Sequence, residues 1–295
     1  MDYLEKYGYC PDENAINASI QAIAANLDNM ASRETLMNCF SLMDLTTLKV
    51  NDTVASVKKF VDKVNRLEAE YPEYPQPASL CVYPYFVPTV CEARKSQIHC
   101  TAAAGCFPSS QSFLEVKVKE CEMCVEAGAD EIDIMLALNA FLVEDYDAAF
   151  NEIKTMKEAI DAKAAAMGRT VVFKVILETG MLVTPEKIAR ASFLAMEAGA
   201  DFIKTSTGKV EVNATPMAAT VMCECIRKFY ESTGRMVGFK AAGGISTAKD
   251  ALGYYLIVSN ILGKDWLNRK YFRLGVSRLG NSLMSAIEQK TVTFF

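Results

Sequence analysis

The sequence predicts a (β/α)8 TIM barrel, and three observations support this fold class. Eight short apolar segments with strand character alternate with segments of helical periodicity along 295 residues, which is typical of a parallel sheet with crossover helices. Barrels of about 250 residues routinely form one domain. An open doubly wound sheet is the alternative, but no G-x-G-x-x-G turn follows an early strand. We expect an N-terminal helical extension over residues 1–35 and the barrel over residues 36–295.

The expected strands are short, apolar and bounded by turn residues. In chain order they cover residues 40–48, 79–83, 97–103, 130–136, 170–179, 200–204, 236–240 and 271–275. Several of these strands end in polar residues, although a buried strand is expected to be apolar along its whole length. In a barrel these ends meet at one mouth, so they are the first place to look for chemistry.

Capping residues and apolar spacing mark the expected helices. Asp52 or Thr53, Ser109 or Ser110, Thr184-Pro185 and Ser246 or Thr247 each supply a helix start. The expected helices cover about 12–30, 53–70, 90–95, 110–127, 145–167, 185–198, 215–232 and 278–289, with a further helix that begins at Ser246 or Thr247. The first of them precedes the barrel, and we expect it to pack over one barrel end.

Composition narrows the function classes. A net charge of −5 leaves no basic surface for nucleic acid or an anionic membrane. No window reaches the roughly 18 apolar residues of a membrane span, and the N-terminus lacks a signal-like apolar core. We therefore expect a cytoplasmic protein that acts on a small molecule.

Histidine and cysteine usage excludes other chemistry. His99 is the single histidine, whereas serine or cysteine triads need a histidine base and catalytic zinc usually takes several imidazoles. The ten cysteines are dispersed, so we expect reduced thiols. Cys121 and Cys124 form a CxxC inside a helical pattern, where packing is favoured over metal or redox chemistry. We expect no cofactor and no metal.

Lys204 is the candidate nucleophile. It ends the apolar segment over residues 200–204 and precedes Thr205-Ser206-Thr207-Gly208-Lys209. Burial at a strand end disfavours the ammonium form and leaves part of the amine free to attack a carbonyl. The alternative is a lysine whose head reaches solvent from the strand end.

Further ionisable residues join Lys204 at the expected mouth. These are Asp44, Asp133, Lys174, Glu178 and Lys240. Neighbouring strands lie about 4.8 Å apart, so Lys204 and Lys240 are expected to be close, which lowers the pKa of at least one. Asp133 with Lys240 suits proton relay through a water. A purely structural salt bridge of Asp133 with Lys240 or Lys174 would use the same geometry.

Three glycine-containing loops follow the last strands. They contain Gly208-Lys209, Gly243-Gly244 and Gly275-Val276-Ser277. Loops at this place in a barrel often bind phosphate through backbone N–H groups, so they suggest a phosphorylated substrate.

Four motifs together resemble deoxyribose-phosphate aldolase. They are Leu42-Met43-Asp44-Leu45-Thr46-Thr47-Leu48, Lys174-Val175-Ile176-Leu177-Glu178-Thr179-Gly180, residues 201–209 with Val212-Asn213-Ala214-Thr215-Pro216, and Gly238-Phe239-Lys240-Ala241-Ala242-Gly243-Gly244. The similarity extends from about residue 36 to residue 285.

The resemblance implies a class I aldolase on a (β/α)8 barrel. That family cleaves 2-deoxy-D-ribose 5-phosphate to acetaldehyde and D-glyceraldehyde 3-phosphate without a metal. It implies a Schiff base on Lys204 and relay roles for Lys240 and Asp133. The expected substrate-binding residues are Asp44, Thr47, Cys81, Lys174 and Thr207, and the expected phosphate contacts are Gly208, Lys209, Gly243, Gly244, Gly275 and Ser277. Arg278 replaces a usual second serine, and it is a candidate for an additional cation at the phosphate.

Three alternatives stay open at this point. One is a lysine aldolase for another short sugar or for unphosphorylated deoxyribose. A second is a non-catalytic sugar-phosphate binding barrel, and a third is a metal-dependent aldolase, for which one histidine is too few. A sugar phosphate is the expected partner, a homodimer is compatible with the fold class, and the sequence fixes no interface.

Overall fold

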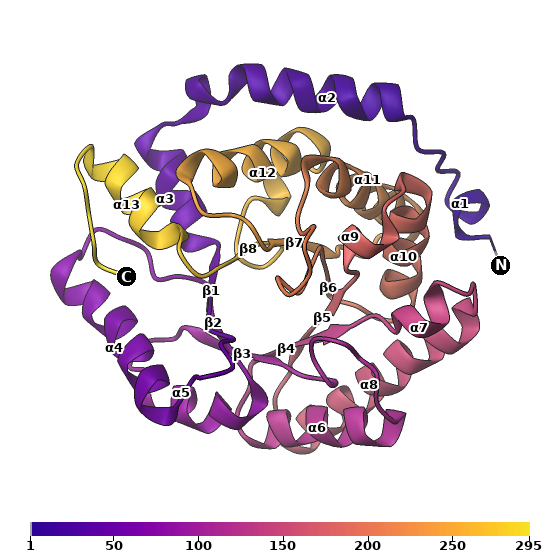
Figure 1. The fold of residues 1–295 in the computed structure, drawn as a ribbon, viewed down its shortest axis with the longest axis horizontal. Helices are drawn as coiled ribbons and strands as arrows, with labels where there is room; N and C mark the ends of the chain where they lie inside the picture. The colour runs from indigo at the N-terminus through magenta and orange to yellow at the C-terminus, as the bar shows by residue number, and fades with distance from the viewer. Residues whose placement is uncertain (1) are drawn as a thin grey trace.

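The structure is a computed structural model, which describes residues 2–295. Its eight parallel strands close into a barrel in sequence order, β1-β2-β3-β4-β5-β6-β7-β8. The helices form a ring around these strands, as the view down the barrel shows (Figure 1). The predicted TIM barrel is therefore confirmed. Within residues 2–295, no helix has the length and apolar character needed to cross a membrane.

Six of the strands are shorter than the apolar segments that predict them, and the last two keep the predicted length but begin two residues and one residue later. The strands are β1 Met43–Thr46, β2 Ser79–Val82, β3 His99–Ala103, β4 Glu131–Met135, β5 Val172–Ile176, β6 Phe202–Lys204, β7 Gly238–Ala242 and β8 Phe272–Val276. The parallel register pairs Asp133 with Lys174 and Lys204 with Lys240. These ionisable residues, which the barrel topology places at one mouth, are therefore neighbours across the sheet.

The helices follow the expected order, with several short additions. They are α1 Tyr3–Lys6, α2 Glu13–Asn26, α3 Arg33–Ser41, α4 Val54–Glu70, α5 Val87–Ala93, α6 Leu114–Glu126, α7 Leu138–Phe141, α8 Tyr146–Ala166, α9 Thr179–Leu182, α10 Pro185–Glu197, α11 Pro216–Thr233, α12 Ala248–Ile261 and α13 Leu279–Glu288. Three 3-10 turns complete the chain at Asp28–Met30, Pro84–Phe86 and Lys264–Trp266. Thr53, Thr184, Thr215 and Thr247 each accept a backbone N–H at a helix start.

Two details of the predicted elements are wrong. Phe40 and Ser41 end the helix α3 instead of starting a strand. Ser109 and Ser110 do not cap α6, which begins after Phe113. Ser110 instead accepts a hydrogen bond from Lys117 at 3.0 Å, so its hydroxyl anchors the loop before the helix.

The N-terminal helix α2 lies on the flank of the barrel. It packs against α11 and α12, outside the ring of helices (Figure 1). The expectation that it covers one barrel end is wrong, because its apolar residues Ile16 and Ile23 are buried against neighbouring helices and not against the strands.

Gly238 leaves room for an aromatic ring inside the barrel. It pairs with Phe202 on the neighbouring strand, and a Cβ at this position would lie 2.4 Å from the Phe202 ring. The Arg273 guanidinium stands over the same ring, 5.6 Å from its centroid. Gly238 and Phe202 therefore form a packed layer inside the barrel, next to the charged residues of the mouth.

We predict that Gly238→Ala lowers the free energy of unfolding by about 1–3 kcal/mol, because the added methyl overpacks this layer. Gly253→Ala is the matched control, since its Cβ would have only Leu27 within reach, at 4.0 Å, and lies within α12. The control should leave stability equal or raise it by up to about 1 kcal/mol. Urea denaturation measures both, and equal stability of the two variants would contradict the packing argument.

Candidate active site

Seven charged side chains form one buried cluster inside the barrel. The carboxylates are Asp44, Glu131 and Asp133, and the cationic groups are Lys174, Lys204, Lys240 and Arg273. They come from strands β1, β4, β5, β6, β7 and β8. Each is at most 4% exposed. Burial of so many charges is costly unless every one is paired.

Asp133 lies between the three amines. Its Oδ2 accepts hydrogen bonds from Lys204 Nζ and from Lys240 Nζ, both at 2.8 Å. Its Oδ1 accepts a hydrogen bond from Lys174 Nζ at 2.7 Å. Asp133 and Lys240 are thus in direct contact, whereas the sequence favoured a water between them.

The remaining charges extend the cluster across the barrel. Lys240 Nζ also donates to Asp44 Oδ2 at 2.5 Å, and Lys174 Nζ lies 2.6 Å from Glu131 Oε2. Arg273 joins these two carboxylates, at 2.6 Å from Asp44 Oδ1 and 2.7 Å from Glu131 Oε1. Hydrogen bonds therefore link all seven groups into one network.

The composition of the cluster favours a neutral amine. Four cationic groups face three carboxylates, so the fully ionised cluster has one excess positive charge. Burial lowers the pKa of Lys204, and the neighbouring Lys240 ammonium lowers it further, against the attraction of Asp133. Burial also works against the charge of Lys240, but Asp133 and Asp44 outweigh burial and raise the pKa of Lys240 above its usual value. Of Lys204 and Lys240, Lys204 is thus the amine that loses its proton more readily.

The carboxylates stay ionised. Burial alone would raise the pKa of Asp133, but Lys174, Lys204 and Lys240 together hold this pKa well below its usual value. Likewise Arg273 and Lys174 overcome burial and hold the pKa of Glu131 well below its usual value. Asp133 is therefore available as a hydrogen-bond acceptor beside Lys204.

A cavity of about 280 Å³ opens above Lys204 at the barrel mouth. All six residues expected to contact phosphate line it: Gly208, Lys209, Gly243, Gly244, Gly275 and Ser277. Gly208, Gly243 and Gly244 have positive φ angles of 79°, 86° and 82°. Such a conformation suits glycine and turns backbone N–H groups toward a bound anion.

The other expected substrate residues fall into three groups. Thr47 and Thr207 line the cavity, whereas Asp44 and Lys174 belong to the charged cluster beneath it. Cys81 is fully buried, and burial raises the pKa of its thiol. Cys81 is therefore a neutral packing neighbour of the cluster and not part of the cavity wall.

Glu178 supports the cavity from behind. It has a left-handed backbone (φ 55°), and its carboxylate accepts hydrogen bonds from the backbone N–H of Thr207 at 3.1 Å and from the Thr207 hydroxyl. Burial raises the pKa of Glu178 in spite of these bonds. The carboxyl group thereby fixes the loop that carries Gly208 and Lys209.

Sequence reasoning missed Arg273 and Lys49. Arg273 lies in a segment that we interpreted only as an apolar strand. A charged residue within an apolar strand is the pattern that identified Lys204, and Arg273 has the same pattern. Lys49 lines the cavity together with Arg278, and it directly follows the segment Thr46-Thr47-Leu48 in the sequence. Arg278 itself is at the position where the sequence suggested an extra cation.

Known proteins resemble this chain in sequence and fold. The profile of the DeoC/LacD family of aldolases matches residues 39–254. A Caenorhabditis elegans protein with the provisional name deoxyribose-phosphate aldolase is 38% identical over 273 residues, covering 91% of this chain and 86% of the relative.

Two solved structures share the fold. The deoxyribose phosphate aldolase of Aeropyrum pernix, described as a tetramer, is 24% identical with a TM-score of 0.65, and the match covers 95% of this chain and 98% of that chain. A Toxoplasma gondii protein with the provisional name deoxyribose-phosphate aldolase is 22% identical with a TM-score of 0.72, covering 87% of this chain and 98% of that chain.

The family match and the charged barrel mouth define the protein as an aldolase, and therefore as a lyase. More narrowly, the chain belongs to the DeoC/LacD aldolase family, so the resemblance drawn from its motifs is confirmed.

We predict that Arg273→Met lowers the free energy of unfolding by about 3–5 kcal/mol, because it leaves Asp44 and Glu131 buried without the guanidinium that donates hydrogen bonds to both. Lys154→Met, which breaks an exposed helical pair with Glu158 at 3.9 Å, should cost less than about 1 kcal/mol. Thermal and urea unfolding compare the two variants. Similar losses would mean that the buried network is not the source of stability.

We also predict that Lys240→Met raises the pKa of Lys204. The change removes a repelling positive charge and frees Asp133 to hold the Lys204 ammonium. Acetic anhydride labelling across a pH series, with quantification of the Lys204 peptide, should therefore show half-maximal reactivity at higher pH. Lys58→Met, an exposed lysine of α4, should leave the midpoint unchanged, and an unchanged or lower midpoint in Lys240→Met would contradict the electrostatic argument.

Proposed function

We propose that this enzyme reversibly cleaves 2-deoxy-D-ribose 5-phosphate to acetaldehyde and D-glyceraldehyde 3-phosphate through a Schiff base on Lys204. The observation that carries the proposal is the buried Lys204 amine, with its lowered pKa, at the floor of a glycine-lined cavity. The family match gives the aldolase class, and the C. elegans relative suggests the substrate. Deoxyribonucleoside catabolism in the cytoplasm is the role that we propose for it.

The first steps use the neutral amine of Lys204. Its Nζ adds to the aldehyde carbon C1 of the open-chain sugar, and loss of the resulting hydroxyl as water gives an iminium ion. Departure of this hydroxyl needs a proton, and Lys240, whose pKa is raised, remains an ammonium next to Lys204. We assign Lys240 and Asp133 to this proton relay. Asp133 accepts a hydrogen bond from Lys204, and Lys240 donates a hydrogen bond to Asp133.

Cleavage then breaks the bond between C2 and C3. Removal of the proton from the C3 hydroxyl converts C3 into the aldehyde of glyceraldehyde 3-phosphate, and the bonding electrons move to C2 as an enamine. Protonation of C2 and hydrolysis of the iminium release acetaldehyde and restore Lys204. The ionised Asp133 can stabilise the positive charge of the iminium. The cationic groups of the cluster can stabilise negative charge that develops as protons move.

The glycine loops hold the far end of the substrate. In this proposal the C5 phosphate accepts hydrogen bonds from the loop backbones at Gly208, Gly243 and Gly244, with Arg278 and Lys49 as nearby cations. The Lys209 ammonium donates to the Leu48 carbonyl, so it also ties the loop after β6 to the loop after β1. Binding at the phosphate positions C1 against Lys204.

We expect Lys204→Met to reduce cleavage of deoxyribose 5-phosphate by about a thousand-fold or more, because the covalent pathway is lost. Coupling of glyceraldehyde 3-phosphate release to NADH oxidation measures the rate. Lys58→Met provides the matched surface control, and circular dichroism checks that both variants fold. Undiminished turnover in Lys204→Met would rule out the assigned nucleophile.

We expect the enzyme to prefer the phosphorylated sugar over free deoxyribose, because the loop glycines and Arg278 contact the phosphate. Arg278→Ser should raise KM for deoxyribose 5-phosphate by about ten-fold, the contribution of one charge-assisted hydrogen bond, and leave cleavage of free deoxyribose unchanged. A wild-type enzyme that cleaves free deoxyribose with the higher kcat/KM would favour the alternative of an unphosphorylated substrate.

A further inference from the structure

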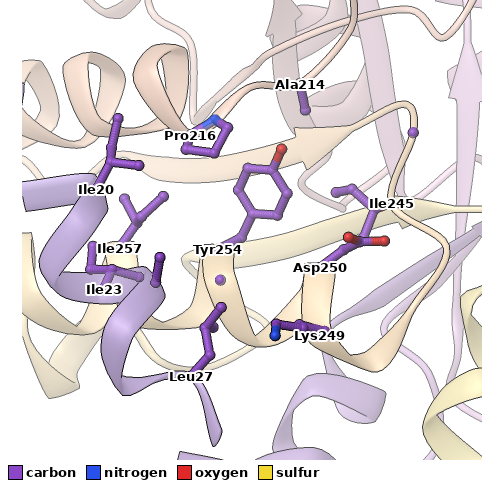
Figure 2. A pocket seen from close by; sticks show the side chains of 13 residues that line it. Ile20, Ile23, Leu27, Ala214, Pro216, Ile245, Lys249, Asp250, Tyr254 and Ile257 are labelled. Carbon is purple, nitrogen blue, oxygen red and sulfur yellow. The ribbon is translucent and has the colours of Figure 1, made fainter. Parts of the chain in front are cut away.

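A second cavity lies between the N-terminal helix α2 and the helices α11 and α12. Its volume is about 410 Å³, within the range of small-molecule sites. Ile20 and Ile23 of α2 form one side together with Leu27, which directly follows the helix, and Ile257 and Tyr254 of α12 form another (Figure 2). The lining is mostly aliphatic, so an occupant gains by burying apolar surface.

One polar group in this cavity has no partner. Tyr254 is 8% exposed, and its hydroxyl makes no hydrogen bond to any group that the structure describes. Its ring stands in the middle of the cavity, with the hydroxyl toward Pro216 and Ala214, which also line the space (Figure 2). Burial raises the pKa of Tyr254, so the group stays a neutral phenol that can donate or accept one hydrogen bond.

The charged carboxylate at the edge of the cavity is already engaged. Asp250 Oδ2 accepts hydrogen bonds from the backbone N–H groups of Ser246 at 3.0 Å and of Thr247 at 2.9 Å. These bonds hold the start of α12, directly after Gly244 and Ile245. Lys249, the other charged residue of the lining, is also engaged in an interaction, so neither charged group is left to bind an ionised ligand and the cavity favours an uncharged occupant.

We propose that this cavity binds a small, uncharged, largely apolar molecule that carries one hydrogen-bonding group for Tyr254. The inference goes beyond the proposed aldolase reaction, since the site is separate from Lys204. Gly244 lines both this cavity and the glycine-lined cavity at the barrel mouth, so the occupant would contact the same loop as the substrate phosphate. The N-terminal extension thus supplies one wall of a ligand site.

N-Phenyl-1-naphthylamine is a suitable probe, because it is uncharged, apolar and has a single N–H donor. Its fluorescence rises in apolar surroundings, so titration of the full-length protein measures binding without any aldolase assay. We expect saturable one-to-one binding. Tyr254→Phe should weaken it about two- to ten-fold, the factor of one neutral hydrogen bond.

Gly253 allows the cavity to be filled. It lies in α12 and lines the cavity, and a Cβ there would meet only Leu27, at 4.0 Å. Gly253→Phe should abolish saturable binding, whereas Gly253→Ala should retain it. Should Gly253→Phe fail to fold by circular dichroism, Tyr254→Phe still tests the site.

A control separates this cavity from the apolar groove between α5 and α6, which Tyr85 and Met123 line. Met123→Lys places a charge in that groove and should leave binding unchanged. Loss of binding in Met123→Lys with retention in Gly253→Phe and Tyr254→Phe would overturn the proposal, as would a wild-type protein that gives no saturable signal.

Discussion

The excess positive charge of the buried cluster is the constraint on which the rest of the site depends. Four cationic side chains share three carboxylates within a closed barrel, and the strand register brings them together from six strands. Asp44 and Asp133 stabilise Lys240 in its charged form, Asp44 and Glu131 do the same for Arg273, and Lys204 is the group that bears the excess. Removal of its proton relieves the cluster and also creates the nucleophile that imine chemistry requires.

The sequence predicted the barrel and the residues of its mouth because both follow from local patterns. A lysine or an aspartate in an apolar strand is visible in the chain, and parallel topology places all strand ends together. Arg273 shows the limit of this reasoning: its partners Asp44 and Glu131 lie on other strands, so its role depends on how side chains meet across the barrel interior. The path of α2 was likewise not predictable, because an amphipathic helix can pack on any apolar face.

The loops also combine predictable and unpredictable features. Glycines at 208, 243 and 244 suggested an anion site, and their positive φ angles give the physical reason for glycine there. The start of α6 was misplaced because Ser110, a good capping residue by type, instead contacts the buried Lys117. The link from α2 through Ile245 and Gly244 to the barrel mouth appears only when distant segments of the chain are brought together.

Borohydride trapping tests the central claim most directly. The protein is incubated with acetaldehyde or deoxyribose 5-phosphate, reduced and digested, and the modified peptide is identified by mass spectrometry. A two-carbon adduct on Lys204, absent in Lys204→Met, is the predicted result. An adduct on Lys240 would reassign the nucleophile, and the absence of any adduct from the folded protein would contradict the covalent mechanism.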